Sequence, residues 1–279
     1  MKNKKLAICT PCNEGMFPIN YVASSHAILQ KPPKGWDIEY SMMRGTSDIT
    51  NARNSIINMF YYNSDIDAMM FIDSDVGMFP QDLGKMLGHL DKDGVDFIGG
   101  NYCKKKFNFP LILQTASQWT KKEIQAKDVL CASAEYVSSG QHLFYEEGEL
   151  EGLCEVDGLG MGCFIITRES ADKLFKWAEK ELEKTTFHTL GKEIKGYGVC
   201  NHVVTDEGNF GEDYSLCMRI KQAGLRIFID PSVKLTHTGM YDWDGDFLKF
   251  LEHKQALAKA ETKMELDNSY DNNIKELKK

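Results

Sequence analysis

The chain has 279 residues, 42% of them hydrophobic, and carries a formal net charge of −8. This length can bury a large core, and no apolar run is long enough to span a bilayer, so we expect a soluble protein of the cytoplasm without a transmembrane segment. The acidic balance argues against a broad nucleic-acid-binding surface, although Lys104, Lys105 and Lys106 leave open a local basic pocket for phosphates.

Short apolar runs without alternation predict strands that are covered on both faces, at residues 6–9, 68–72, 95–99, 163–167 and 225–229. Helical spacing with start and stop signals predicts helices between them, at residues 51–62, 80–90, 170–184 and 212–222. Strands that alternate with helices predict an α/β fold, with a mixed, mostly parallel central sheet flanked by helices.

Other regions are less regular. Residues 115–155 mix charges, glycines and aromatic residues, and we expect an insertion or a lid there. Residues 185–210 are polar and rich in glycine, which predicts a loop, and the acidic segment 242–246 fails the spacing of a calcium-binding EF-hand, which predicts a solvated loop. Residues 1–246 are expected to form one domain, followed at 247–279 by a helix that ends in a polar tail.

The eight cysteines, in a chain without a recognisable secretory signal, favour reduced thiols over disulfides. Cys9 and Cys12 have the CxxC spacing of redox and zinc motifs. They close a predicted strand instead of opening a helix, and no second CxxC pair follows, so we interpret the spacing as coincidence.

The most informative segment is the apolar run 68–72 with Asp73, Ser74 and Asp75 directly after it. In extended backbone, side chains at i and i+2 point to the same side, about 6–7 Å apart. A divalent cation relieves the repulsion between two such carboxylates, and oxygen ligands suit Mg²⁺ or Mn²⁺ shared with phosphates. Ligands of open α/β sheets also gather at the carboxyl ends of strands. The alternative is that Asp73 and Asp75 are turn residues that cap the next helix; the buried strand before them favours a site.

Two later segments add candidates. Glu212 and Asp213 open a predicted helix, where acids complement the helix dipole, but a carboxylate at the edge of the sheet could also act as a general base. Local spacing does not separate these two readings. His237 follows the short apolar run 233–235 and lies just before a glycine, which makes it a better metal ligand candidate than the other histidines, although most isolated histidines have no such role.

Taken in order, these segments resemble the metal-dependent glycosyltransferases of the GT-A fold, which has a Rossmann-like sheet. They are most similar to the small virus- and bacterium-encoded members related to family 2. The similarity spans about residues 4–240. Its segments are Thr10-Pro11-Cys12-Asn13-Glu14, Thr50-Asn51-Ala52-Arg53-Asn54, Phe71-Ile72-Asp73-Ser74-Asp75, Gly99-Gly100-Asn101-Tyr102, Gly160-Met161-Gly162-Cys163-Phe164, Gly211-Glu212-Asp213-Tyr214, Asp230-Pro231 and Leu235-Thr236-His237-Thr238-Gly239.

The resemblance implies a role for each matched position. The Asp73-Ser74-Asp75 triplet would bind the metal and the diphosphate, and His237 would complete the metal site. Asp213, or with less support Glu212, would be the general base. The residues expected near the donor, its base or its sugar are Thr10, Pro11, Asn13, Arg53, Gly160 and Gly162.

The sequence therefore predicts an enzyme that transfers a sugar, with inversion, from a nucleotide-sugar donor to a glycan or another hydroxyl acceptor. The donor is expected to be a UDP- or GDP-sugar, the cofactor Mn²⁺ or Mg²⁺, and no nucleic acid is expected as a partner. Two alternatives stay open. A phosphatase of the haloacid dehalogenase type also has Asp-x-Asp after an apolar strand, and a sugar- or nucleotide-binding module could have lost catalysis.

Overall fold

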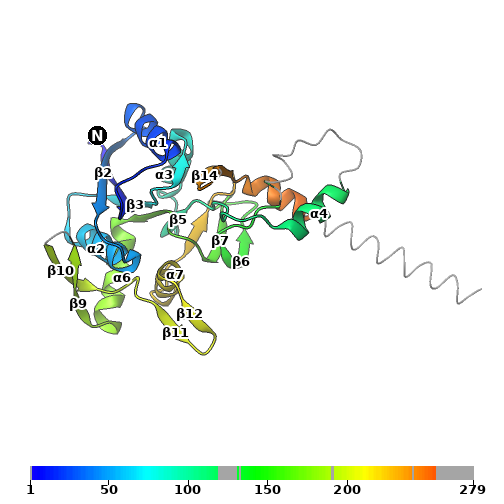
Figure 1. Ribbon diagram of the computed structural model, residues 1–279. Helices are drawn as coiled ribbons and strands as arrows, with labels where there is room; N and C mark the ends of the chain where they lie inside the picture. The colour runs from blue at the N-terminus through cyan, green and yellow to red at the C-terminus, as the bar shows by residue number, and fades with distance from the viewer. Residues whose placement is uncertain (1, 119–130, 132, 190–191, 241, 256–279) are drawn as a thin grey trace, which may run out of the picture. The chain divides into compact units, whose positions relative to one another are not determined.

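The computed structural model describes residues 2–118, 131, 133–189, 192–240 and 242–255 (Figure 1). The chain divides into two compact units. The first unit consists of Met1–Lys105 and Tyr136–Gly245, and the second of Lys106–Glu135 and Asp246–Lys279. All the strands and all the candidate site residues lie in the first unit. In the described part of the second unit, α4 (Phe109–Gln118) and residues 247–255 are helical.

An eight-stranded sheet forms the centre of the first unit. Its strands, in spatial order, are β2 (Trp36–Arg44), β1 (Lys4–Cys12), β3 (Ala68–Ile72), β8 (Cys163–Thr167), β5 (Phe97–Gly99), β13 (Ile227–Ile229), β7 (Cys154–Gly158) and β6 (Ser139–Phe144). β1 pairs in parallel with β2 and β3, and β5 with β13, whereas β8 and β7 run antiparallel to both of their neighbours. The predicted α/β fold with a mixed, mostly parallel sheet flanked by helices is therefore confirmed.

Helices cover both faces of this sheet (Figure 1). They are α1 (Ile19–Gln30), α2 (Ile49–Tyr62), α3 (Pro80–His89), α6 (Arg168–Glu181) and α7 (Glu212–Gln222). Met70 and Ile72 of β3 join the core cluster that contains Ile28 of α1 and Leu83 of α3. On the other face, Phe175 of α6 stacks on the ring of Tyr61 in α2 at 4.0 Å. Because it is covered on both faces, every residue of β3 is buried, and this explains its unbroken apolar run.

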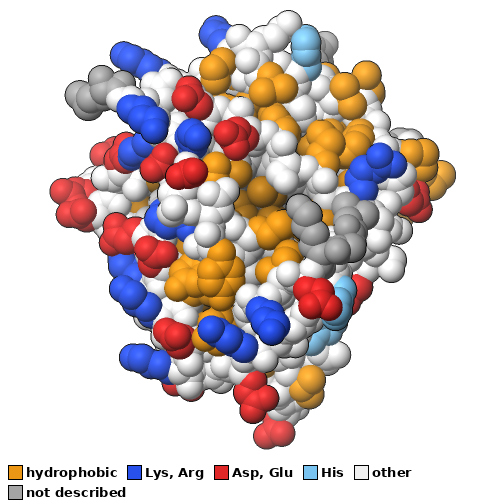
Figure 2. All heavy atoms as spheres, turned by 90° about the vertical axis from the view of Figure 1, so that its left-hand side faces the viewer, with side chains coloured by type: hydrophobic (Ala, Val, Ile, Leu, Met, Phe, Trp, Pro, Cys, Tyr) orange, Lys and Arg blue, Asp and Glu red, His pale blue; other side chains and the backbone are white. Residues whose placement is uncertain are grey.

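Smaller sheets surround the carboxyl edge of the central sheet. One has the order β15 (Asp242–Asp244), β14 (Leu235–Thr238), β4 (Val76–Met78). Two hairpins follow α6: β9 (Lys184–Thr189) with β10 (Lys192–Tyr197), and β11 (Val203–Thr205) with β12 (Gly208–Phe210). Charges of both signs are interspersed with apolar side chains on the face shown in Figure 2.

Several sequence-based expectations differ from this structure. The predicted loop at 185–210 is wrong, because these residues form the two hairpins; their strands are short and largely polar and so lack an apolar pattern. The predicted solvated loop at 242–246 is likewise wrong for 242–244, which pair with β14 as an edge strand. Helix α1 was missed because it buries only Tyr21, Ser24 and Ile28, too few for a clear apolar stripe.

The less regular region 115–155 falls partly outside the described residues. Its later part contains β6 and the start of β7, which pair with each other at the edge of the central sheet. An insertion or lid at 115–155 and a domain boundary at 246 stay predictions. All eight cysteines lie in the described part of the chain; they are buried and none forms a disulfide, including Cys9 and Cys12 of the CxxC pair.

No helix among the described residues is long and apolar enough to cross a bilayer.

Candidate active site

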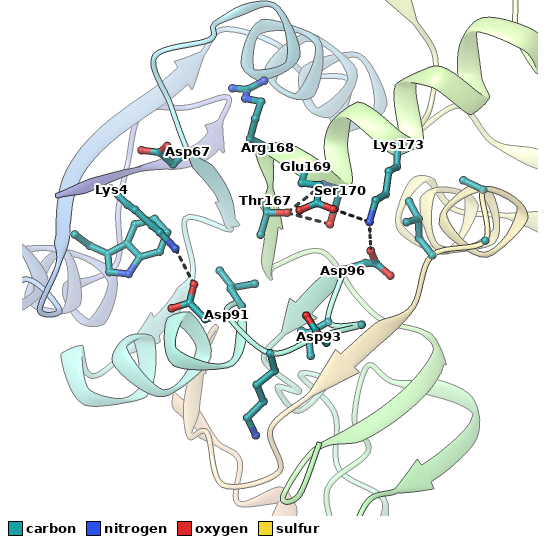
Figure 3. Close-up of a pocket in the computed structure, with 18 residues that line it drawn as sticks. Lys4, Asp67, Asp91, Asp93, Asp96, Thr167, Arg168, Glu169, Ser170 and Lys173 are labelled. Carbon is teal, nitrogen blue, oxygen red and sulfur yellow. Dashed lines mark hydrogen bonds and ion pairs between the residues drawn. The ribbon is translucent and has the colours of Figure 1, made fainter. Parts of the chain in front are cut away.

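Two places on the first unit gather charged side chains, and they lie at opposite ends of the sheet. The first is a cavity of about 690 Å³ (Figure 3). Lys4 at the start of β1 and Thr167 at the end of the reversed strand β8 line it, so it lies at the amino edge. Its charges are largely paired within the protein: Lys4 lies 2.7 Å from Asp91, and Lys173 lies 3.0 Å from Glu169. Because ligands of α/β sheets bind at the carboxyl edge, this cavity is the weaker candidate.

The second place is the carboxyl end of β3, where the Asp73-Ser74-Asp75 triplet begins. Val76 donates its backbone N–H to the carbonyl of Asp73 at 3.0 Å, so the triplet forms a turn between β3 and β4. The extended backbone that was expected for Asp73 and Asp75 is therefore wrong. The turn gives each aspartate its own set of partners.

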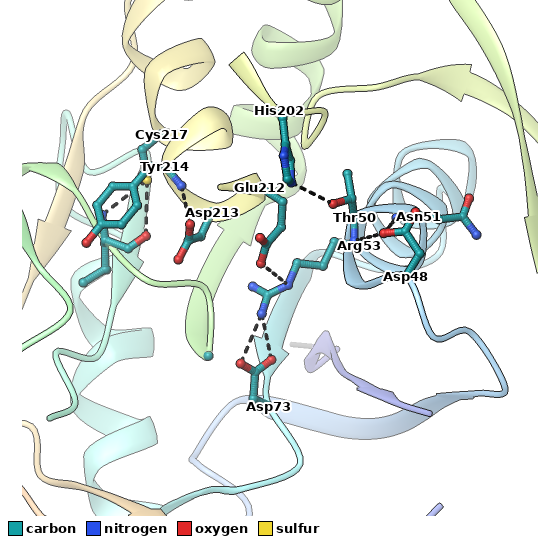
Figure 4. A network of polar contacts seen from close by, with 12 residues as sticks. Asp48, Thr50, Asn51, Arg53, Asp73, His202, Glu212, Asp213, Tyr214 and Cys217 are labelled. Carbon is teal, nitrogen blue, oxygen red and sulfur yellow. Dashed lines mark hydrogen bonds and ion pairs between the residues drawn. The ribbon is translucent and has the colours of Figure 1, made fainter. Parts of the chain in front are cut away.

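Asp73 and Glu212, both partly exposed, form a cluster with the buried Arg53 (Figure 4). Nη2 of Arg53 donates to both carboxylate oxygens of Asp73, at 3.0 and 3.1 Å, and Nε lies 3.5 Å from Oε1 of Glu212. Only 5% of the Arg53 side chain is exposed. Burial alone lowers the pKa of Arg53, but the two carboxylates outweigh burial and raise it. Nε faces Glu212 at a distance longer than a hydrogen bond, and Nη1 makes no hydrogen bond, so this buried guanidinium is held mainly by charge and by Nη2.

Helix α2 places Arg53 because its N-terminal half is anchored. Asp48 caps the helix by accepting hydrogen bonds from the backbone N–H groups of Thr50 and Asn51, at 2.9 and 3.3 Å. Next to Arg53, the amide of Asn54 accepts from the N–H of Cys200 at 2.8 Å and donates to Asn201 at 2.8 Å. These buried polar contacts fix the orientation of the helix that carries the guanidinium.

Asp75 lies outside the Arg53 cluster and contacts two other side chains. Nζ of Lys105 forms an ion pair with Oδ2, and Nε2 of His237 lies 3.6 Å from Oδ1. Burial raises the pKa of Asp75, but hydrogen bonds from His237 and Lys105 outweigh it and lower this pKa to about 2. The carboxylate is thus ionised at any physiological pH.

The orientation of His237 suits a metal ligand. Its Nδ1 lies 2.8 Å from the carbonyl oxygen of Cys103, which can only accept, so Nδ1 carries the proton. When both ring nitrogens carry protons, the N–H of Nε2 points at the Asp75 carboxylate; in the neutral ring with its proton on Nδ1, Nε2 presents a lone pair there, where a metal ion would take the place of the proton. Metal-ligating histidines usually donate their other N–H in this way, and two facing acceptors invite a cation between them. The donor set of one carboxylate and one imidazole fits Mn²⁺.

The structure brings Asp75 and His237 together, whereas Asp73 is held by Arg53. Among the described residues, no three His, Cys, Asp or Glu side chains are grouped so as to hold a metal ion. The predicted metal set of Asp73, Asp75 and His237 therefore stays a prediction, with two of its members in contact.

Asp213 lies in the first turn of α7, beside the Arg53 cluster (Figure 4). Burial raises the pKa of its carboxyl, and the neighbouring Glu212 adds to this, while the backbone N–H of Tyr214, at 2.8 Å, acts in the opposite direction. A raised pKa makes a carboxylate a stronger base. Glu212 is instead committed to Arg53, which favours Asp213 as the basic residue of the pair.

Tyr102 is a site residue to which the sequence gave no role. Its hydroxyl accepts the backbone N–H of Gly162 at 3.0 Å, and its ring lies edge-on against His237 at 4.9 Å. A Cβ on Gly160 would lie 2.8 Å from this hydroxyl, and one on Gly162 only 2.5 Å. The two glycines are therefore needed for the close approach of Tyr102. Its place in the segment Gly99–Tyr102, after a strand, was the only signal in the sequence.

The remaining predicted residues lie at the same edge. β1 pairs in parallel with β3 and runs on to Cys12, which brings Pro11 and Asn13 to the edge where the triplet begins. Thr10 is fully buried, and its hydroxyl lies 2.7 Å from that of Tyr21, so this group is used inside the fold. Asn13 is exposed and Ser74 is partly exposed. Contacts of these residues with a donor stay predictions.

No protein-family model and no curated protein matches the sequence. Solved structures are similar in fold. A197 from STIV is 18% identical, with a TM-score of 0.48 over 84% of this chain and 86% of that chain. A mutant Drosophila β-1,4-galactosyltransferase 7 in complex with manganese, UDP-Gal and xylobiose is 13% identical, with a TM-score of 0.40 over 87% of this chain and 70% of that chain. GalNAc-T7 with UDP, GalNAc and Mn²⁺ is 9% identical, with a TM-score of 0.44 over 84% of this chain and 43% of that chain. Similarity at this level assigns no activity to the chain.

Proposed function

We propose that the first unit is a glycosyltransferase domain that moves a sugar from a nucleotide-sugar donor to an acceptor hydroxyl, with Mn²⁺ or Mg²⁺ as cofactor. One observation carries the proposal. His237, oriented through Nδ1 by the carbonyl of Cys103, directs Nε2 at the ionised carboxylate of Asp75 at the carboxyl edge of the sheet. The sequence resemblance assigns these two residues the same role.

In this proposal Asp75 and His237 hold the metal, and Asp73, held by Arg53, would complete the site as the resemblance implies. The bound metal would supply positive charge to the diphosphate of the leaving group. Arg53, which lies between Asp73 and Glu212, would orient Asp73 and place its positive charge beside the donor. Gly160 and Gly162 leave room for the hydroxyl of Tyr102. Thr10, Pro11 and Asn13 are proposed to lie near the nucleobase of the donor.

Asp213 is proposed as the general base. Its carboxylate would take the proton of the acceptor hydroxyl while that oxygen attacks the anomeric carbon. The bond from the anomeric carbon to the phosphate oxygen breaks, and its electron pair leaves with the nucleoside diphosphate. Attack from the side opposite the leaving group inverts the anomeric configuration. Glu212 would keep Arg53 in place and would not react, because its carboxylate is paired with the guanidinium.

A panel of UDP-, GDP- and dTDP-sugars tests the proposal, with binding and donor hydrolysis measured with and without Mn²⁺. We expect one nucleotide class, UDP or GDP, to bind in a metal-dependent manner and to be hydrolysed slowly in the absence of an acceptor. Hydrolysis of a chromogenic phosphate ester without any response to sugar nucleotides would favour a phosphatase. Metal-dependent binding without turnover under any acceptor condition would favour a non-catalytic binding module.

A further inference from the structure

Lys105 reaches Asp75 from the segment that follows β5, and this segment is anchored on both sides. The carbonyl of Cys103 accepts from Nδ1 of His237 at 2.8 Å, and its thiol donates to the carbonyl of Trp243 at 3.1 Å. The stem of Lys105 lies over Gly239, where a Cβ would meet its Cδ at 3.1 Å. The contacts of Cys103 fix the chain two residues before Lys105, and Gly239 leaves room for the lysine stem. Together they direct the ammonium group at Asp75.

The two aspartates of the triplet therefore have different internal cations. Asp73 is paired with Arg53, whose side chain is 5% exposed and which also faces Glu212. Asp75 is paired with Lys105, and both of these side chains are 32% exposed. Separating a buried pair leaves an uncompensated charge, whereas a partly exposed pair separates at little cost because water screens it. Of the two pairs, the one between Lys105 and Asp75 can open.

We propose that Lys105 is an exchangeable counter-ion, which pairs with Asp75 in the free protein and moves to the diphosphate of the donor when a divalent cation binds Asp75 and His237. This inference rests on the proposed function and adds to it a residue that would stabilise the leaving nucleoside diphosphate. The move needs no backbone change, because a lysine side chain has a long flexible stem and a compact charge that suits phosphate.

Charge explains why the exchange would be favourable. A divalent cation and an ammonium compete for the same oxygens of Asp75, and Nζ already contacts Oδ2. The cation repels Lys105 once it is bound, while a diphosphate brought by that cation offers the ammonium a new anionic partner within its reach. Lys105 thus opposes binding of the metal alone and favours binding of the metal together with the nucleotide.

Lys105→Met removes the charge and keeps most of the stem, and calorimetry measures two affinities that should change in opposite directions. We expect Mn²⁺ alone to bind about two- to fivefold more tightly than in the wild type, the range for a partly exposed ion pair. We expect UDP, titrated in saturating Mn²⁺, to bind about ten- to hundredfold more weakly, the range for a lost hydrogen bond to a charged group. Lys105→Arg should stay close to the wild type in both titrations.

Lys34→Met is the matched control, because it removes one exposed lysine charge of the first unit away from the site, and it should change neither affinity. If Lys105→Met weakens the binding of both Mn²⁺ and UDP, or changes neither, the inference is overturned. A purely structural role of Lys105 would change both affinities in the same direction. The wild-type titrations test the proposed function separately: a wild type that binds neither Mn²⁺ nor UDP contradicts that function whatever the variants do.

Discussion

Nη2 of Arg53 donates to both carboxylate oxygens of Asp73, at 3.0 and 3.1 Å, from a helix twenty positions earlier in the chain. The guanidinium is buried and has a second carboxylate, that of Glu212, on its other side. One aspartate of the triplet is thus neutralised by the protein itself. Asp75, which lies against His237 and Lys105 and is more exposed, is left as the carboxylate that a cation can reach.

The first prediction concerns the stability of this cluster. Arg53→Met should lower the free energy of unfolding by about 3 kcal/mol, the lower end for a buried ion pair, because it leaves the largely buried carboxylates of Asp73 and Glu212 without their cation. Urea unfolding measures this. The double variant Arg53→Met with Asp73→Asn removes one of the stranded charges and should recover part of the loss; a double variant whose losses simply add would show that the pair is not coupled.

The second prediction follows from the raised pKa of Asp213. A carboxyl whose pKa is higher in the folded state binds its proton more tightly there, so it stabilises the fold at low pH and loses this contribution as pH rises through the folded pKa. Asp213→Asn should therefore raise the melting temperature at pH 7, and the gain should vanish below the ordinary value of 3.8. Asp206→Asn, at an exposed position, is the control. If Asp213→Asn lost the same stability at pH 7 and below pH 3.8, the cost of burying the Asp213 carboxylate would be contradicted.

The third prediction concerns Gly162. A methyl group there would lie 2.5 Å from the hydroxyl oxygen of Tyr102 and 3.0 Å from Oδ2 of Asp73, so Gly162→Ala should destabilise the fold by about 1–3 kcal/mol, as overpacking does. Adding Tyr102→Phe removes the clashing hydroxyl and should restore part of the stability. Gly84→Ala is the control, since nothing lies within 4 Å of the added carbon in α3, and it should be neutral or stabilising. Denaturant midpoints of the variants compare these effects.

The fourth prediction concerns His237 as a ligand. His237→Gln should weaken Mn²⁺ binding at least tenfold, because the amide is a poorer ligand than the imidazole that is already oriented by Cys103. His26→Gln, an exposed position on α1, should bind Mn²⁺ like the wild type. Electron paramagnetic resonance of free Mn²⁺ measures both. If His237→Gln and His26→Gln bound Mn²⁺ with equal affinity, His237 would not be a metal ligand.

The sequence was informative where local chemistry decides the structure. The run 68–72 is fully buried β3, as expected, and α7 spans Glu212–Gln222 as predicted, because a glycine lies just beyond each end and acids stand in its first turn. Helix α6 begins earlier than predicted, at Arg168, since the side chain of Thr167 accepts from the N–H of Ser170 and caps it.

The partners of the triplet could not be predicted, because each comes from a distant segment. Nothing local to Arg53 shows that it is buried against Asp73, and its neighbours Ile56 and Ile57 suggested an ordinary amphipathic helix. The three lysines at 104–106 left a local phosphate pocket open. It is the pairing of β14 with β4 that brings His237 to Asp75, while Lys105 reaches Asp75 from the segment after β5.

Anomalous scattering from a crystal soaked with Mn²⁺ and UDP shows whether Asp75 and His237 hold the metal. We expect one strong manganese peak within coordination distance of a carboxylate oxygen of Asp75 and of Nε2 of His237, with the diphosphate of UDP on its open side. A manganese peak elsewhere, or bound UDP with no manganese at Asp75 and His237, would contradict it.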